Sequence, residues 1–171
     1  MKRRYVLLSV GILLSVVVVA LSIHYTSIPS LEKQLSSAIP SYDRVLYTES
    51  HENLEVAFYW TTEQQLGLVL FEPNRDQLHL LGIVGSHDPH GLSYTAEEFD
   101  EQDVYVAYGV VSNPSIEHVL VNGNSTEMMT TEVARVWFYV ADESFQTLDI
   151  IGLDEEESVV YNSRDLLERN A

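Results

Sequence analysis

The sequence of 171 residues contains no cysteine, and only nine lysine and arginine residues stand against 26 aspartate and glutamate residues. Without cysteine the chain has no disulfide, no thiol nucleophile, no thiolate metal ligand and no amino-terminal cysteine for lipid attachment. A formal net charge of −17 makes the surface repel nucleic acid and anionic lipid headgroups. The sequence therefore predicts no nucleic-acid partner.

Recognisable catalytic motifs are also missing. The chain has no phosphate-binding glycine loop, no Gly-x-Ser-x-Gly turn and no His-Glu-x-x-His helix. Pairs of carboxylates occur anywhere in a chain with 26 acidic residues, so their presence does not indicate glycosidase chemistry. The sequence favours a protein without enzymatic activity, and it predicts no catalytic residues and no cofactor.

The amino terminus carries the most informative pattern in the chain. Residues 5–23 contain no charged side chain, and they follow the basic residues 2–4. Nineteen helical residues span about 28 Å, which is close to the hydrocarbon thickness of a bilayer. Basic residues flanking such a helix stay on the cytoplasmic side. We therefore predict a cytoplasmic stub at residues 1–4 and a transmembrane anchor at residues 5–24, with the remaining chain outside the cytoplasm.

A cleaved secretory signal is the alternative interpretation of this segment. Residues 20–22 place small side chains at the spacing that a signal peptidase requires. The apolar run is, however, longer than the 7 to 15 residues typical of a signal core, which favours a retained anchor. Both interpretations place the remainder of the chain outside the cytoplasm.

A spacer at residues 25–41 follows the predicted anchor. Leu31, Leu35 and Ile39 recur every four residues, and Pro40 ends the pattern. This spacing predicts a short helix over residues 30–38 with one apolar stripe. The stripe is expected to lie either on the following domain or on the membrane surface.

From residue 42 the apolar pattern changes from helical to alternating, which indicates strands. The pattern predicts nine strands, at residues 44–49, 54–60, 65–71, 77–84, 104–111, 116–121, 132–141, 145–153 and 158–161. Short turns join the first strands, and such turns favour antiparallel neighbours. We therefore predict an all-β or β-dominated domain over residues 42–162, either an antiparallel sandwich or a strongly curled meander. Residues 163–171 form its tail.

Two finer expectations concern the segments between these strands. Residues 95–102 are rich in acidic side chains, and we expect one or two helical turns there. The strands at residues 132–141 and 145–153 are expected to pair with each other around a turn at residues 142–144. The strand at residues 104–111 is apolar on both faces, which predicts a central strand covered on both sides.

The carboxyl-terminal strand motifs are ordinary in composition but follow a recognisable order. They are Tyr-Gly-Val-Val at 108–111, Ile-Glu-His-Val-Leu-Val-Asn-Gly at 116–123, Arg-Val-Trp-Phe-Tyr-Val at 135–140, Ile-Gly-Leu-Asp at 151–154 and Val-Val-Tyr at 159–161. With the anchor, the region 104–161 resembles a group of uncharacterised small membrane-anchored exported proteins of Gram-positive bacteria. The sequence departs from that pattern at residues 85–91 and 155–157. The resemblance implies an exported β domain and no particular activity.

The longest loop holds the sharpest chemical candidate. His87, Asp88 and His90 place two imidazoles three residues apart with a carboxylate between them. Imidazole and carboxylate groups suit zinc or copper, so these three residues are the candidate metal ligands. A further ligand is expected from among Glu97, Glu98 and Asp100. The competing interpretation is a polar connector that binds no metal.

Arg135 and Trp137 are two residues apart in a predicted strand, so both should project from the same face. In a chain with few basic residues, a partly buried Arg135 paired with a carboxylate would fix one part of the sheet. An anion site is the functional alternative for this arginine.

Three hypotheses about function follow from these features. The first is a membrane-tethered extracytoplasmic acidic domain that interacts with, or senses, a cell-envelope protein or wall component. The second is an exported metal-binding domain that uses His87 and His90. The third is a cell-wall hydrolase whose site carries no recognisable motif.

Overall fold

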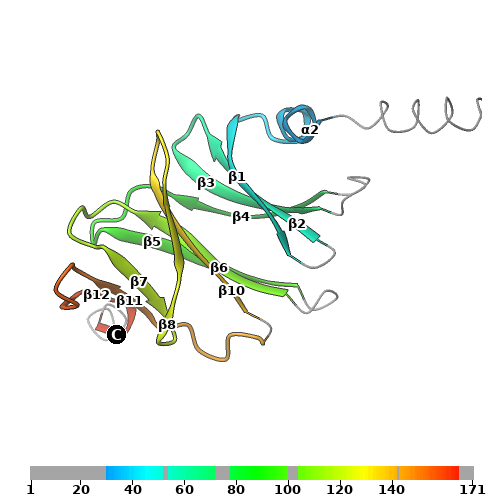
Figure 1. Ribbon diagram of the computed structural model, residues 1–171. Helices are drawn as coiled ribbons and strands as arrows, with labels where there is room; N and C mark the ends of the chain where they lie inside the picture. Colours follow the sequence, from blue (N-terminus) through cyan, green and yellow to red (C-terminus); the bar gives the residue numbers. More distant parts are fainter. Residues whose placement is uncertain (1–29, 52–53, 72–77, 100–103, 142, 166–171) are drawn as a thin grey trace, which may run out of the picture.

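A computed structural model describes residues 30–51, 54–71, 78–99, 104–141 and 143–165 of the protein. One helix of eight residues and twelve strands lie in these ranges, and residues 163–165 at their end are also helical (Figure 1). In chain order these are α2 (Leu31–Ala38), β1 (Tyr42–His51), β2 (Leu54–Thr61), β3 (Gln65–Phe71), β4 (Leu78–Gly85), β5 (Leu92–Phe99), β6 (Val104–Val111), β7 (His118–Val121), β8 (Asn124–Ser125), β9 (Glu127–Thr130), β10 (Arg135–Ala141), β11 (Ile150–Leu153) and β12 (Val159–Asn162). Within these described ranges no helix is long and apolar enough to span a bilayer. The predicted anchor at residues 5–24 lies outside them.

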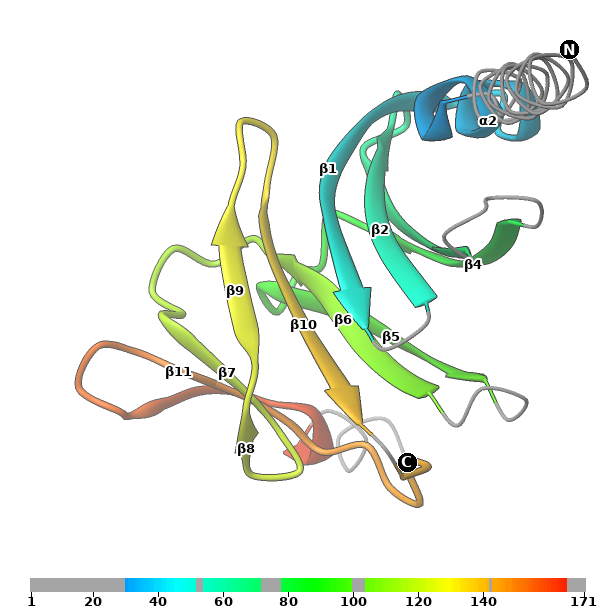
Figure 2. The ribbon, with the colours of Figure 1, turned by 45° about the vertical axis from the view of Figure 1, so that its right-hand side comes forward.

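The strands form three four-stranded antiparallel sheets. Sheet A has the order β1-β2-β3-β4, sheet B the order β5-β6-β10-β9, and sheet C the order β12-β11-β7-β8. Figures 1 and 2 show sheet B between the other two sheets, with α2 on the far side of sheet A. The prediction of a β-dominated antiparallel domain is confirmed, and sheet A is the meander that the short turns indicated.

Helix α2 is fixed at both ends by its own sequence. The Ser30 hydroxyl accepts a hydrogen bond from the Lys33 amide at 3.4 Å, which caps the first turn. The helix ends where the Ile39 amide donates to the Leu35 carbonyl at 2.8 Å. Leu31, Leu35 and Ile39 are buried against the outer face of sheet A. The apolar stripe therefore lies on the domain, which is one of the two surfaces that the sequence allowed.

Sheets A and B pack face to face through alternate residues of their strands. Val56, Phe58 and Trp60 of β2 share one buried cluster with Tyr108 of β6 and Phe138 of β10. The Phe58 ring lies 5.1 Å from the Phe138 ring and 5.7 Å from the Tyr108 ring, measured between centroids. These aromatic contacts join the two sheets at the centre of the molecule.

The opposite face of sheet B packs against sheet C. Ala107, Val111 and Trp137 of sheet B belong to a second cluster with Val119 and Ile150 of sheet C. Because both faces of sheet B are covered, all eight residues of β6 are buried. The prediction of a central, doubly covered strand at residues 104–111 is confirmed.

Strand β4 interrupts the regular ladder with a β-bulge. Gly67 of β3 pairs with Ile83 and Val69 pairs with Leu80, so Leu81 and Gly82 lie opposite the single residue between them. The freed Gly82 amide donates to the Glu97 carboxylate at 3.1 Å, and the Tyr108 hydroxyl donates to the Gly82 carbonyl. Side chains from sheet B therefore satisfy the backbone groups that the bulge leaves unpaired.

Two sequence expectations are wrong in this part of the chain. Helical turns were expected at residues 95–102. Residues 95–99 instead belong to strand β5, which pairs with β6 from Leu92 to Phe99. Pairing with β6 outweighs the weak helical preference of a few acidic residues. The expected pairing of residues 132–141 with 145–153 does not occur either. Strand β10 lies in sheet B between β6 and β9, whereas β11 lies in sheet C between β7 and β12.

Candidate ligand pocket at the end of the sheets

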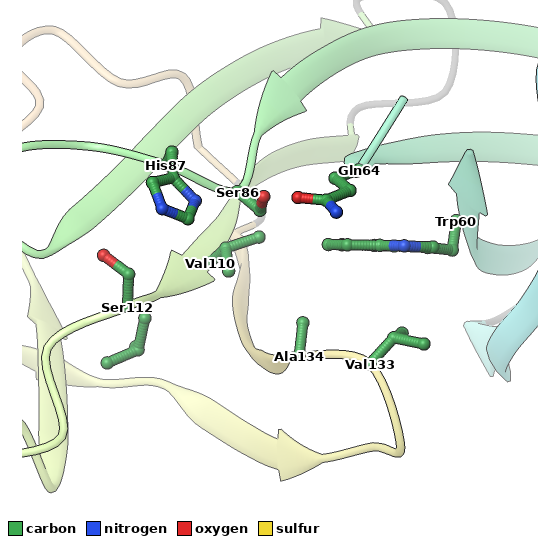
Figure 3. A pocket seen from close by; sticks show the side chains of 9 residues that line it. Trp60, Gln64, Ser86, His87, Val110, Ser112, Val133 and Ala134 are labelled. Atoms are coloured by element: carbon green, nitrogen blue, oxygen red, sulfur yellow. The ribbon is translucent and has the colours of Figure 1, made fainter. Parts of the chain in front are cut away.

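A pocket of about 350 Å³ lies where the ends of sheets A and B meet the loop between β4 and β5. Its lining comes from five separate parts of the chain: the end of β2, the β2–β3 turn, the loop after β4, the end of β6 and the turn before β10. The lining residues are Trp60, Gln64, Ser86, His87, Val110, Val111, Ser112, Val133 and Ala134 (Figure 3).

Local hydrogen bonds hold the β2–β3 turn in place. The Thr61 hydroxyl accepts from the Gln65 amide at 3.1 Å, and the Thr61 carbonyl accepts from the Gln64 amide at 3.0 Å. Gln64 adopts a φ of +60°, in the left-handed region that favours glycine. Its carbonyl accepts from the Ser86 amide at 3.1 Å, which ties the turn to the loop after β4.

The loop at residues 86–91 has a defined backbone. The Asp88 carboxylate accepts from the His90 amide at 2.7 Å, and the Asp88 carbonyl accepts from the Gly91 amide at 3.0 Å. Gly91 has a φ of +89°, and an added Cβ would lie 2.3 Å from the Cβ of Asn113. The Gly91 carbonyl also accepts from the Ser112 and Asn113 amides at 3.0 and 2.9 Å. The loop is thereby fastened to the end of β6.

The pocket combines an apolar wall with uncharged polar groups. Trp60, which is 5% exposed, presents its indole ring, and Val110 and Val133 extend the apolar surface. Figure 3 shows Trp60 and Gln64 on one side of the space and His87 and Ser112 on the other. None of the nine described lining residues is aspartate or glutamate, and His87 is the single titratable group among them. Such a mixture of an apolar wall and a few polar groups is typical of ligand-binding pockets.

A second, shallower hollow of about 270 Å³ lies on the other side of the same loop. It is lined by Asp88, Pro89, His90, Gly91, Ser112 and Asn113. Tyr161 of sheet C lies near Asp88 of this hollow. Burial raises the pKa of the Tyr161 hydroxyl, and the neighbouring Tyr94 and Asp88 raise it further. The phenol therefore stays neutral beside the Asp88 carboxylate.

The structure divides the predicted metal ligands between the two hollows. His87 lines the larger pocket, whereas Asp88 and His90 line the shallower one. Glu97 is hydrogen-bonded to Gly82, and Asp100 lies outside the described residues. Among the described residues, no group of three histidine, aspartate or glutamate side chains is placed to hold a metal ion. Metal binding by this loop stays a prediction that the arrangement does not support.

Arg135 is partly buried and paired with a carboxylate, as the sequence predicted. Its guanidinium donates to the Ile116 carbonyl at 2.6 Å and to the Glu117 carboxylate at 3.3 Å. The side chain is 26% exposed, and it shares its sheet face with the fully buried Trp137. Arg135 therefore fixes the segment that leads from sheet B to sheet C.

Sequence patterns missed most of the larger pocket. The chain separates Trp60 from Ser112 by 52 positions. The local sequence around Trp60, Gln64 and Ser112 indicates a strand end or a turn in each case and gives no sign of a shared pocket. The one sequence signal near the pocket is the glycine- and proline-containing loop with His87, and it pointed to metal chemistry.

No protein-family model matches the chain, and no similar protein is found among curated proteins or among solved structures. The resemblance of residues 104–161 to exported Gram-positive proteins therefore stays a hypothesis.

Proposed function

We propose that this protein is a membrane-tethered, extracytoplasmic β-sandwich domain that binds a component of the cell envelope. Support for the tether comes from the basic residues 2–4 and the uncharged run at residues 5–23. The acidic composition argues against a nucleic-acid partner. The pocket at the end of sheets A and B is the proposed binding site.

The lining of that pocket is the observation that carries the proposal. An indole wall with amide, hydroxyl and imidazole groups suits a neutral ring that bears hydroxyls and amides, as in wall glycans. Glycoside hydrolysis generally needs two carboxylates that flank the scissile bond. The described lining of the larger pocket contains none and that of the smaller hollow contains one, Asp88. Binding is therefore favoured over hydrolysis.

Two glycine substitutions test the proposal with a matched control. Gln64 and Glu157 both adopt a left-handed φ, of +60° and +61°, but only Gln64 lines the pocket. Glycine relieves backbone strain at such positions, so neither Gln64→Gly nor Glu157→Gly should impair folding. We expect Gln64→Gly to weaken retention of the full-length protein on insoluble cell wall about tenfold, while Glu157→Gly leaves it unchanged. Equal retention of both variants would contradict the pocket as the binding site.

The same wall preparation separates the alternatives. A hydrolase would release soluble wall fragments during the incubation, whereas a binding domain leaves the wall intact. A metal-binding domain would carry stoichiometric zinc or copper after purification without chelators.

A further inference from the structure

An exposed apolar strip lies on the face of sheet A that also carries α2. Leu80 and Ile83 of β4 are 43% and 46% exposed, although both are large aliphatic side chains. They lie directly opposite Val69 and Gly67 of β3, and opposite residues of antiparallel strands project from the same face. We call this surface, comprising α2, Leu80 and Ile83, the α2 face.

The strip is continuous with the surface on which α2 rests. The apolar stripe of α2 covers Val69 and Phe71, which are fully buried. Leu78, opposite Phe71, packs partly against the same cluster. Ala57 and Tyr59 of β2 belong to this cluster too, and their cross-strand rows run through β3 to Leu80 and Ile83. Leu80 and Ile83 therefore extend the apolar surface under α2 to the edge strand β4.

The α2 face is also where the chain enters the domain. The predicted anchor ends at residue 24, and Ser30 caps α2. The six residues from 25 to 30 span at most about 20 Å when fully extended. If residues 5–24 cross the bilayer, the start of α2 lies within that distance of the membrane. Sheet C, on the opposite side of sheet B, lies farther from α2 than sheet A does (Figure 2).

We propose that the α2 face contacts the outer surface of the lipid bilayer, with Leu80 and Ile83 reaching its interfacial region. The proposal rests on the tether of the proposed function and adds an orientation to it. Contact through aliphatic side chains gains free energy by removing apolar surface from water. The acidic domain gains nothing from anionic headgroups, so the contact should persist at high salt.

The absence of cysteine makes a direct test practical. Ile83→Cys places a label on the α2 face, and Val159→Cys places a matched label on β12 of sheet C, where the valine is 59% exposed. Each full-length variant is reconstituted into phosphatidylcholine vesicles and labelled with an environment-sensitive dye. Some vesicles also contain a lipid that carries a nitroxide quencher near the headgroup.

We expect the lipid-borne quencher to reduce the emission of the label at position 83 at least threefold more than that at position 159. High salt should leave the difference unchanged. Equal quenching at the two positions, with both variants floating with the vesicles, would overturn the membrane contact and leave the tether intact. Shielding of position 83 from an aqueous quencher that increases with protein density, without lipid quenching, would also overturn it, since a second copy would then cover the strip. A chain that does not float with vesicles would overturn both the tether and the orientation.

Discussion

Strands β4 and β6 have the same length and similar apolar composition, yet their environments are opposite. All eight residues of β6 are buried, whereas Val84 is the one buried residue of β4. Strand β6 pairs with β5 and β10 at its edges and has sheets A and C on its two faces. Strand β4 has β3 as its one ladder partner and carries a bulge.

Position in the sheets, rather than apolar content, therefore decides how deeply each of these strands is buried. An apolar strand with neighbours on every side contributes stability. A similar strand at the edge of a sheet leaves aliphatic side chains available for another surface. Strand β6 is therefore the buried centre of the described domain, whereas β4 carries the exposed side chains of the proposed bilayer contact.

The largest effect is expected at Trp137, which lies opposite Gly109 of β6 and is fully buried. Trp137→Ala should lower the free energy of unfolding by about 3–5 kcal/mol, because it leaves a cavity between sheets B and C. Urea denaturation followed by circular dichroism measures this change. A loss below 1 kcal/mol would mean that the packing of sheet B against sheet C contributes little to the stability of the domain.

A smaller effect is expected where β6 supports β4 directly. Tyr108→Phe removes the hydroxyl that donates to the Gly82 carbonyl of the bulge. Leaving that carbonyl without its donor should lower the free energy of unfolding by about 1–2 kcal/mol at neutral pH. The same denaturation measurement applies, and an unchanged midpoint would show that the bulge does not depend on sheet B.

The Tyr108 hydroxyl should also make the free energy of unfolding depend on pH in the alkaline range. Burial raises the pKa of the Tyr108 hydroxyl above its ordinary 10.0, and Glu97 and Tyr59 raise it further. Above pH 10 the unfolded chain therefore releases this proton while the folded chain keeps it. Stability should fall with rising pH, by up to about 1.4 kcal/mol per pH unit from this group. In Tyr108→Phe the decline should be shallower, so its deficit relative to the natural chain should shrink between pH 9 and pH 11.

Strand β4 should tolerate polar substitution on its exposed face. Ile83→Ser should change the free energy of unfolding of the protein in detergent by less than about 0.5 kcal/mol, because the side chain is already half-exposed. A loss of several kcal/mol would show that Ile83 is a core residue, which would contradict the proposal that it contacts another surface.

The smallest effect is expected in the loop that follows β4. His87 and His90 are exposed and line separate hollows, so replacing both with alanine should change stability by less than about 0.5 kcal/mol. Metal analysis of the purified protein provides the second readout. Stoichiometric zinc or copper that disappears in the double variant would establish the loop as a metal site.

Local patterns predicted the elements that local interactions determine. Leu31 and Leu35 at helical spacing predicted α2. Alternation predicted β2, and the apolar run after a short turn predicted β3, both within one residue at their ends. Strand β5 was missed because its pairing with β6 is a property of the assembled sheet, not of the acidic residues Glu97 and Glu98.

The pocket was harder to predict than the strands for the same reason. Gln64 lines the pocket because its residue in the β2–β3 turn adopts a left-handed backbone conformation. Ser112 lines it because the Ser112 amide donates a hydrogen bond to the Gly91 carbonyl, which holds the end of β6 against the loop. Neither fact is visible in local periodicity. The pairing of β11 with β7 across sheet C, rather than with β10, likewise depends on which hydrophobic faces meet.

The functional account depends most on the claim that the domain lies outside the cytoplasm. Val159→Cys introduces one exposed thiol into a chain without cysteine, and a membrane-impermeant maleimide can then be applied to intact cells. We expect the full-length variant to be labelled without permeabilisation, to remain in the membrane fraction, and to be absent from the medium. The cysteine-free natural chain, treated in parallel, should remain unlabelled. Labelling that appears only after the membrane is opened would place the domain in the cytoplasm and contradict the account.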